Sequence, residues 1–152
     1  MANPGRYYLG EGMPAPAPSV DGLDTEYWEG IKQHKLFVQH CHTCDRPQFG
    51  PEWVCHICHS FDMGWREVEG NGRIYSWERV WHPVHPALQD SCPYLVVLVE
   101  LPNHENVRMV GNLVGDPMQT VEIGAEVRPV FEDHEGTDET EPFTLVHWEV
   151  VG

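Results

Sequence analysis

Four of the five cysteines lie close together in the sequence, as two Cys-x-x-Cys pairs. The pairs are Cys41 with Cys44 and Cys55 with Cys58, and ten residues separate them. A Cys-x-x-Cys turn places two thiolates at the spacing of two ligands on one metal ion, and two such turns complete a tetrahedral site suited to zinc or iron. The spacing therefore predicts one metal ion bound by four cysteines.

Disulfide bonding is a second possible use of these cysteines. The N-terminal residues contain no apolar stretch typical of a signal peptide, and no run approaches the ~18 apolar residues of a membrane helix. We therefore expect a cytoplasmic protein with no membrane contact. Structural disulfides are rare in a reducing compartment, and an odd number of cysteines would leave one unpaired. Metal binding is the favoured interpretation.

The positions that flank the cysteines are also informative. His40, His42, His56 and His59 could act as ligands in principle, but four cysteines already complete a site, so we expect these histidines around it or in solvent. The residue after each pair often adopts a left-handed backbone conformation that favours glycine. Asp45 and His59 occupy these positions here, and both tolerate that conformation better than most residues do.

One helix is predicted before the cysteines. Residues 24–36, DTEYWEGIKQHKL, begin with two capping candidates, Asp24 and Thr25, and large apolar side chains then recur at helical spacing. This pattern predicts a packing helix of two to three turns. The first twenty residues contain the proline-rich stretch PAPAP and are expected to form an extended arm.

Strands are predicted after the cysteines. Pro129 would interrupt a central ladder, so its run is expected to be an edge strand or to contain a bulge. Five short strands in about eighty residues suit a small closed barrel. The five predicted runs span residues 72–81, 94–101, 107–114, 126–131 and 144–150.

Residues 27–80, which include YWEGIKQHKLFVQHCHTC, resemble the DUF35 family when they are read together with the later PYLVVLVEL, VGNLVG and IGAEVRPVFE. These are OB-fold, acyl-CoA-associated proteins with a rubredoxin-like zinc ribbon, and the resemblance extends from about Asp24 to Trp148. It implies a mainly β fold with an N-terminal helical segment, a four-cysteine zinc ribbon and a five-stranded OB-fold barrel. The implied boundaries are 1–36 for the arm and helix, 37–66 for the ribbon and 67–152 for the barrel.

The resemblance also implies a function. Family members typically accompany thiolase-superfamily enzymes, or related acyl-CoA hydratases and aldolases, as small subunits. The chain is therefore expected to be a non-catalytic subunit that binds structural Zn²⁺, or Fe, and binds or channels the CoA part of an acyl-CoA thioester. Its partner in a hetero-oligomer would be a thiolase-superfamily enzyme or a hydratase of the hot-dog type, in lipid or steroid side-chain metabolism. Glu52 stands where the family often has a cation, which predicts weaker or different CoA binding.

Two other functions remain as alternatives. A zinc ribbon joined to an OB barrel also describes nucleic-acid-binding modules, but these need a positive field. The formal net charge here is −15, so polyanions would be repelled and no nucleic-acid partner is expected. A rubredoxin-like electron carrier is the second alternative, because four thiolates also bind iron.

Ligand binding could involve the first predicted strand of the barrel. If residues 72–81 alternate regularly, Arg73, Trp77 and Arg79 share one face, where guanidinium groups could hold phosphates and the indole could stack on adenine. Packing of the aromatic side chains in the barrel is the simpler interpretation, and a bulge would break the shared face. No catalytic constellation is evident, and Cys92 is expected to be a free cysteine in a loop.

Overall fold

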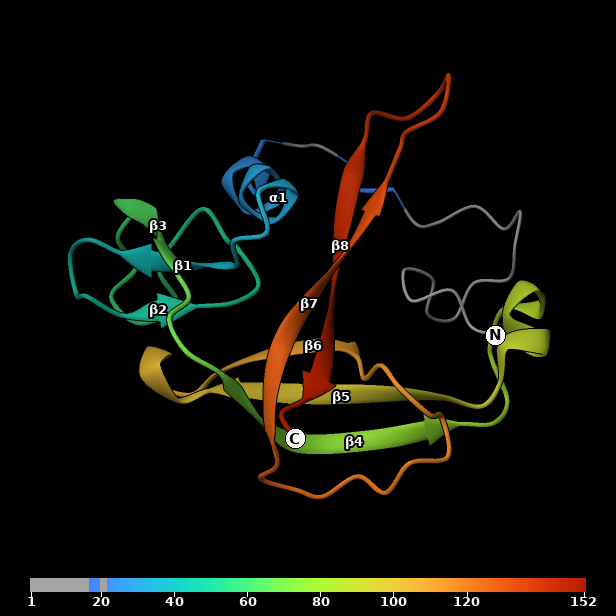
Figure 1. The fold of residues 1–152 in the computed structure, drawn as a ribbon. Helices are drawn as coiled ribbons and strands as arrows, with labels where there is room; N and C mark the ends of the chain where they lie inside the picture. Colours follow the sequence, from blue (N-terminus) through green and yellow to red (C-terminus); the bar gives the residue numbers. More distant parts are fainter. Residues whose placement is uncertain (1–16, 20–21) are drawn as a thin grey trace.

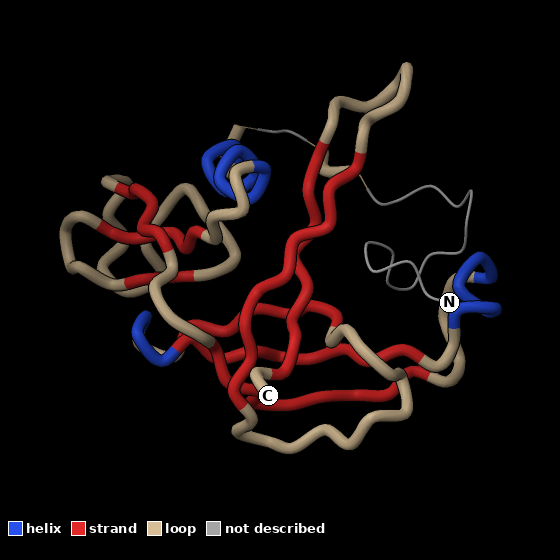
Figure 2. The backbone as a smooth tube through the Cα atoms, viewed as in Figure 1, coloured by secondary structure: helices blue, strands red, loops and turns tan. Residues whose placement is uncertain are grey.

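One short helix precedes two antiparallel sheets in the computed structural model, which describes residues 17–19 and 22–152 (Figure 1). The smaller sheet holds the cysteines, and the larger sheet forms the barrel (Figure 2). The predicted proline-rich arm lies mostly outside the described residues. No helix in the described part of the chain is long and apolar enough to cross a membrane.

Helix α1, Thr25–Lys32, begins at the predicted capping position. Asp24 is the N-cap residue, but its carboxylate accepts a hydrogen bond from the indole Nε1 of Trp28 at 2.8 Å and makes no bond to a backbone amide. Ile31 is fully buried, and Tyr27 packs against Trp28 at a ring-centroid distance of 5.2 Å. Burial, with the nearby Asp24 carboxylate, raises the pKa of Tyr27 to about 12. The helix is therefore a packing element, as predicted.

The ribbon contains three short strands that the sequence did not separate. Strand β1, Phe37–Cys41, lies in the centre and pairs antiparallel with β2, Pro47–Gln48, and with β3, Met63–Glu67. Its buried side chains include Val38 and Cys41. Cys41 therefore begins the first metal-binding turn directly from the end of a paired strand.

The barrel contains five strands, in agreement with the predicted fold. Their order in the sheet is β6-β5-β4-β7-β8, and a parallel bridge between Leu113 and Trp148 connects the end of β6 to β8 and closes the barrel. Trp148 is 1% exposed inside it, and Gly111 leaves the room for its indole ring, because a Cβ at Gly111 would lie 2.7 Å from that ring. The strands are β4, Gly72–Val80; β5, Tyr94–Leu101; β6, Val107–Asn112; β7, Glu126–His134; and β8, Phe143–Val150. Two 3₁₀ helices, η1 at Pro86–Ser91 and η2 at Pro102–His104, lie in the β4–β5 and β5–β6 connections.

Strand β7 is longer than predicted. It pairs with β4 only at residues 126 and 127, and with β8 over its whole length, including Pro129 opposite Trp148. Pro129 thus lies where β7 has β8 as its paired strand and no longer pairs with β4, which agrees with the expected edge position. Beyond the barrel, β7 and β8 continue as a projecting hairpin (Figure 1).

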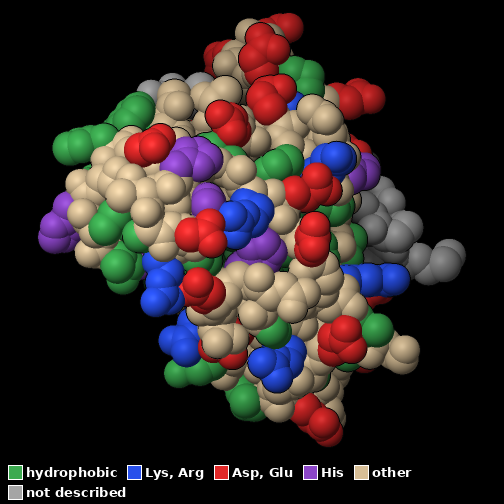
Figure 3. Space-filling view, turned by 90° about the vertical axis from the view of Figure 1, so that its left-hand side faces the viewer, with side chains coloured by type: hydrophobic (Ala, Val, Ile, Leu, Met, Phe, Trp, Pro, Cys, Tyr) green, Lys and Arg blue, Asp and Glu red, His purple; other side chains and the backbone are tan. Residues whose placement is uncertain are grey.

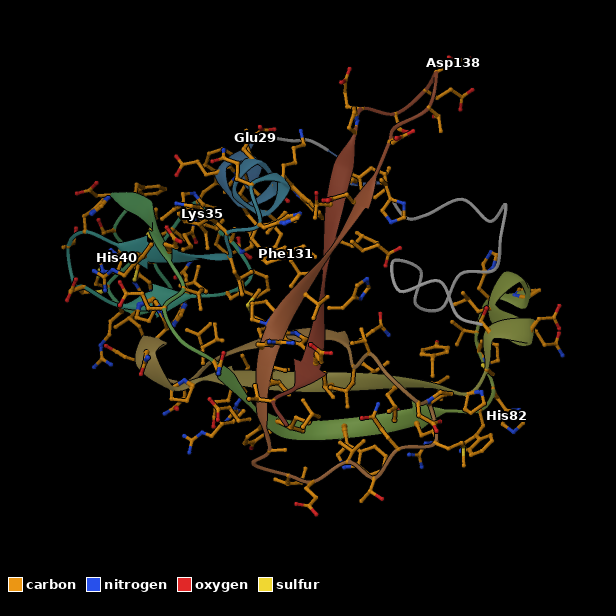
Figure 4. The ribbon with its side chains drawn as sticks, in the orientation of Figure 1. Glu29, Lys35, His40, His82, Phe131 and Asp138 are labelled. Carbon is orange, nitrogen blue, oxygen red and sulfur yellow. The ribbon has the colours of Figure 1, made fainter. Side chains whose placement is uncertain are left out.

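The hairpin contacts the residues that follow α1 and ends in an acidic tip. The ring of His34 stacks on Phe131 at 4.9 Å and its Nε2 lies 3.0 Å from the Asp133 carboxylate. Asp138 marks the tip in Figure 4. Figure 3 shows Asp and Glu side chains gathered over this projection. Part of the negative charge of the chain is therefore gathered on the β7–β8 hairpin.

Candidate metal centre

The two Cys-x-x-Cys turns have the same backbone hydrogen bonds. In the first, the amide of Asp45 donates to the carbonyl of Cys41 at 3.0 Å, and the amide of Cys41 donates to the carbonyl of Arg46 at 2.9 Å. In the second, the amide of His59 donates to Cys55 at 3.0 Å, and the amide of Cys55 donates to Ser60 at 2.9 Å. Equivalent bonds present the cysteines of both turns to a common centre.

The residues that follow each turn adopt the left-handed conformation predicted from the sequence. The φ angles are 58° at Asp45 and 61° at His59. This conformation costs most L-residues about 1–2 kcal/mol, but Asp and His are enriched in it relative to other non-glycine residues. The absence of glycine at these positions therefore does not prevent the turns from forming.

The four sulfur atoms lie within 4.8 Å of one another, and the described residues contain no other such group of possible metal ligands. The Sγ atoms of Cys41 and Cys58 are 3.6 Å apart, as are those of Cys44 and Cys55. A tetrahedron with metal–sulfur bonds of about 2.3 Å has edges of about 3.8 Å. The cluster therefore fits a tetrahedral metal ion, and four sulfur ligands leave no open coordination position for substrate.

The electrostatics of the cluster favour a bound cation. Burial and hydrogen bonds from neighbouring thiols raise the pKa of Cys44 to about 12, whereas the pKa of Cys55 is lowered to about 6, chiefly by a backbone N–H bond from Cys58. Cys44 and Cys55 thus do not lose their protons at the same pH in the absence of a cation. A divalent cation would compensate the charge of the thiolates.

None of the four flanking histidines belongs to the sulfur cluster. His42, His56 and His59 are exposed. His40 is 6% exposed, and its Nε2 lies 2.7 Å from the carboxylate of Asp45 and 2.7 Å from the guanidinium of Arg66. His40 and Arg66 thereby fix the residue that follows the first turn.

Sequence reasoning missed this network, because Arg66 is distant in the sequence and only its pairing in β3 brings it near. A separate ion pair reaches the barrel, since Arg46 pairs with Glu105, which follows η2. The one available signal for the network was an acidic residue directly after Cys44. The network and this ion pair together tie the metal-binding turn to β3 and to the barrel.

The prediction of regular alternation along β4 is wrong. The expected shared face of Arg73, Trp77 and Arg79 depended on it. The register with β5 shifts between Ile74 and Ser76, which makes Tyr75 a bulge residue. Ile74 is buried before the bulge and Trp77 packs on the core after it, so Arg73 and Trp77 lie on opposite faces. CoA binding by Arg73, Trp77 and Arg79 stays a prediction, and no shared face supports it.

Arg79 lies on the same side as Trp77 and has structural contacts of its own. Its guanidinium donates to the carbonyls of Pro117 and Gln119 at 2.8 and 2.6 Å, and lies 5.4 Å from the ring centre of Trp77. These bonds fasten the long β6–β7 connection to β4.

Two family models match adjacent parts of this chain. Residues 28–64 match the rubredoxin-like zinc ribbon domain of ChsH2, and residues 65–132 match the C-terminal OB-fold domain of ChsH2. Among solved structures, the chain is similar to one from the Ltp2-ChsH2(DUF35) aldolase, with 35% identity and a TM-score of 0.69, over 88% of this chain and 98% of that one. A DUF35-family protein from Sulfolobus solfataricus, at 15% identity and a TM-score of 0.59 over 86% of this chain and 87% of that one, shares the fold.

Two curated relatives are named as subunits of hydratases. A probable enoyl-CoA hydratase alpha subunit from Thermomonospora curvata is 38% identical over 74% of this chain and 34% of its own length. The 3-oxo-4,17-pregnadiene-20-carboxyl-CoA hydratase alpha subunit from Mycobacterium tuberculosis is 29% identical over 76% of this chain and 36% of its own length. The chain thus spans about a third of the length of these relatives.

Proposed function

The chain belongs to the ChsH2 family of DUF35 proteins, and from that premise we propose that it is a non-catalytic subunit of an acyl-CoA-processing enzyme complex. The observation that carries this proposal is the similarity to the Ltp2-ChsH2(DUF35) aldolase chain, which is covered over 98% of its length. The proposed partner is a thiolase-superfamily catalytic subunit, and the proposed substrates are acyl-CoA thioesters of lipid or steroid side-chain metabolism.

The metal centre supports a structural role within this proposal. Four thiolates would hold a zinc ion in a closed site, where it would fix the two turns against β1 and β3, and a closed site offers no position for an activated water. Iron would also fit four sulfur ligands. Metal analysis together with a visible spectrum separates the two, because a colourless zinc protein excludes an electron carrier and a red iron protein supports one.

A hydratase subunit of the hot-dog type is the second candidate partner. The observation in its favour is that both curated relatives are named as hydratase alpha subunits. This chain matches only about a third of each relative. We therefore propose that the hydration chemistry belongs to the part of each relative that this chain does not match. The proposed contribution of this chain is to bind the catalytic subunit and to assist with the CoA part of its substrate.

Co-purification from the native cell, followed by mass spectrometry, tests the proposal. The expected result is recovery of a thiolase-superfamily or hydratase subunit, whose turnover of an acyl-CoA rises when this chain is added. A lone monomer that changes no candidate enzyme's activity would contradict it. Turnover of acyl-CoA by the purified chain alone would contradict its non-catalytic status.

A further inference from the structure

Strand β5 is apolar on both faces of the barrel wall. Its inward side chains are fully buried, and its outward side chains are half-buried and mostly apolar as well. An antiparallel sheet with one face in water normally alternates apolar and polar residues, whereas strands covered on both faces are continuously apolar. The inward residues are Leu95, Val97, Val99 and Leu101, and the outward residues are Tyr94, Val96, Leu98 and Glu100.

The neighbouring strands extend this apolar surface. Leu98 pairs with Ser76 of β4 on one side and with Val110 of β6 on the other, so all three share the outer face. Val110 is 70% exposed, and the bulge leaves Tyr75 45% exposed. We name this surface the outer barrel face; its apolar residues are Tyr75, Val80, Tyr94, Val96, Leu98 and Val110.

A charged row borders the face at one end. Arg73 and Arg108 lie opposite Glu100 in the strand register, and the guanidinium of Arg108 is 3.1 Å from the Glu100 carboxylate and 3.6 Å from the ring centre of Tyr75. The side chain of Arg73 is exposed and lies between two carboxylates, because Glu100 of β5 and Glu126 of β7 pair with it in the strand register. The row therefore holds two cations and two carboxylates at the rim of an apolar surface.

On the basis of the proposed function, we propose that the outer barrel face is the surface on which the catalytic subunit docks. Strands β5 and β6 are the second and third strands of the OB barrel, and the face of these two strands is where OB folds bind oligonucleotides and oligosaccharides. Here the exposed carboxylate of Glu78 lies beside Val96 among the apolar side chains, and the bordering Arg108 is already paired, which suits a protein better than a nucleic acid. The matching surface on the catalytic subunit is apolar, with polar groups at its border that meet the charged row.

Binding of purified Ltp2, the protein named together with ChsH2(DUF35) in the similar aldolase structure, tests this docking surface by calorimetry. Val110→Glu places a charge beside Leu98, on the β6 side of the face, at an exposed position. Folding is therefore preserved, while a buried interface would be left with an unpaired charge. We expect at least tenfold weaker binding. Val84→Glu is the matched control, because Val84 is fully exposed in the β4–β5 connection and lies outside the face.

Two further variants separate the alternatives. Arg73→Glu reverses one charge of the row at the rim and should weaken binding most at low salt. Phe61→Glu addresses the exposed ribbon residue that could serve as a rival docking point, since Phe61 is 80% exposed. The proposal expects normal binding by Phe61→Glu.

The outcomes are distinct. If wild type binds Ltp2 and Val110→Glu binds equally well, or if only Phe61→Glu loses binding, the docking surface is wrong while the proposed function stands. If Val84→Glu loses as much affinity as Val110→Glu, the assignment to this face is also wrong. If wild type does not bind Ltp2, the docking surface and the thiolase-type partner both fall, while the hydratase-type partner stands or falls by the co-purification. If wild type instead binds a single-stranded oligothymidine and Val110→Glu does not, the face is a nucleic-acid site.

Discussion

Replacement of one metal ligand should unfold the ribbon and leave the barrel folded. The two regions differ in the number of aliphatic side chains that they bury. The ribbon and the residue before it contribute Leu36 and Val38, at 3% and 0% exposure, whereas the barrel and its connections bury twelve apolar side chains. The twelve are Ile74, Leu95, Val97, Val99, Leu101, Met109, Leu113, Val114, Val121, Val127, Phe143 and Trp148. Cys44→Ser is the proposed change, because Cys44 belongs to the sulfur cluster and is only partly buried.

The magnitude follows from metal linkage. Two buried aliphatic side chains stabilise the ribbon by roughly 3–6 kcal/mol. A metal ion present at a thousandfold excess over its Kd adds about 4 kcal/mol to this burial, so its loss removes roughly half of the stability of the ribbon. A change of 1 kcal/mol shifts the melting temperature of a domain of 60–100 residues by about 4–8 °C, and the ribbon is smaller, so its melting temperature should fall by at least about 16 °C. The barrel retains its own core and should melt separately.

Metal analysis and residue-resolved NMR melting provide the assay. Wild type should contain one metal ion per chain and Cys44→Ser far less, with amide signals from residues 37–66 lost at a lower temperature than those of the barrel. Cys92→Ser is the control, because Cys92 is a half-buried free cysteine outside the cluster. Figure 4 shows His82, which lies in the same β4–β5 connection, far from His40 in the ribbon. Full metal content in Cys44→Ser, or ribbon and barrel signals that vanish at one temperature, would refute the reasoning.

Three further changes probe the turns, the junction and the barrel. His59→Val should destabilise the second turn by about 1–2 kcal/mol, because a β-branched residue is strained at a φ of 61°, while His59→Gly should retain metal; equal metal affinities would contradict this. Burial and the charge of Arg66 lower the pKa of His104, whose Nε2 accepts the Glu69 amide at 3.2 Å. The stabilising contribution of His104 is therefore present above the unfolded pKa of about 6.5 and is lost as the pH falls below it. The difference in unfolding free energy between wild type and His104→Asn should shrink from pH 7.5 to pH 5. A difference that does not change with pH would contradict this prediction. Gly111→Ala should cost about 1–3 kcal/mol in denaturant unfolding, because its Cβ would overlap the Trp148 ring; unaltered stability would show that the ring has room to move.

The features that sequence reasoning predicted depend on short stretches of chain. The sulfur cluster follows from two local turns and the left-handed conformations at Asp45 and His59 follow from their places in those turns, so neither needs information from distant residues. The five barrel strands follow from apolar runs bounded by turn residues, and the structure places them within a few residues of the predicted ranges. The largest difference is at the end of β7, which continues to His134 because it pairs with β8 beyond the barrel.

The features that sequence reasoning missed depend on one inserted residue or on distant partners. Nothing in the side-chain pattern of β4 marks Tyr75 as a bulge, since neither of its neighbours, Ile74 and Ser76, is a glycine or a proline. Equally, the pairing of Arg66 with Asp45 requires the register between β1 and β3. Both are properties of strand pairing, which the hydrophobic pattern of a single strand does not specify.

The bulge also decides which chemistry each side of the barrel presents. Without it, Trp77 and Arg79 would lie on the outside with Arg73, as an aromatic and cationic face suited to a nucleotide. The shift at Tyr75 turns Trp77 to the core and Arg79 to backbone carbonyls, and places Ser76 beside Leu98 and Val110 on the outside. The outer face thereby becomes largely apolar with a charged border, and an apolar centre with a polar rim is the composition of a protein docking surface. Deletion of Tyr75 would reverse this arrangement by restoring regular alternation, so a deletion variant that still folds should lose Ltp2 binding and expose Trp77 to collisional quenchers. A folded deletion variant with unchanged Ltp2 binding would show that the bulge does not set the docking face.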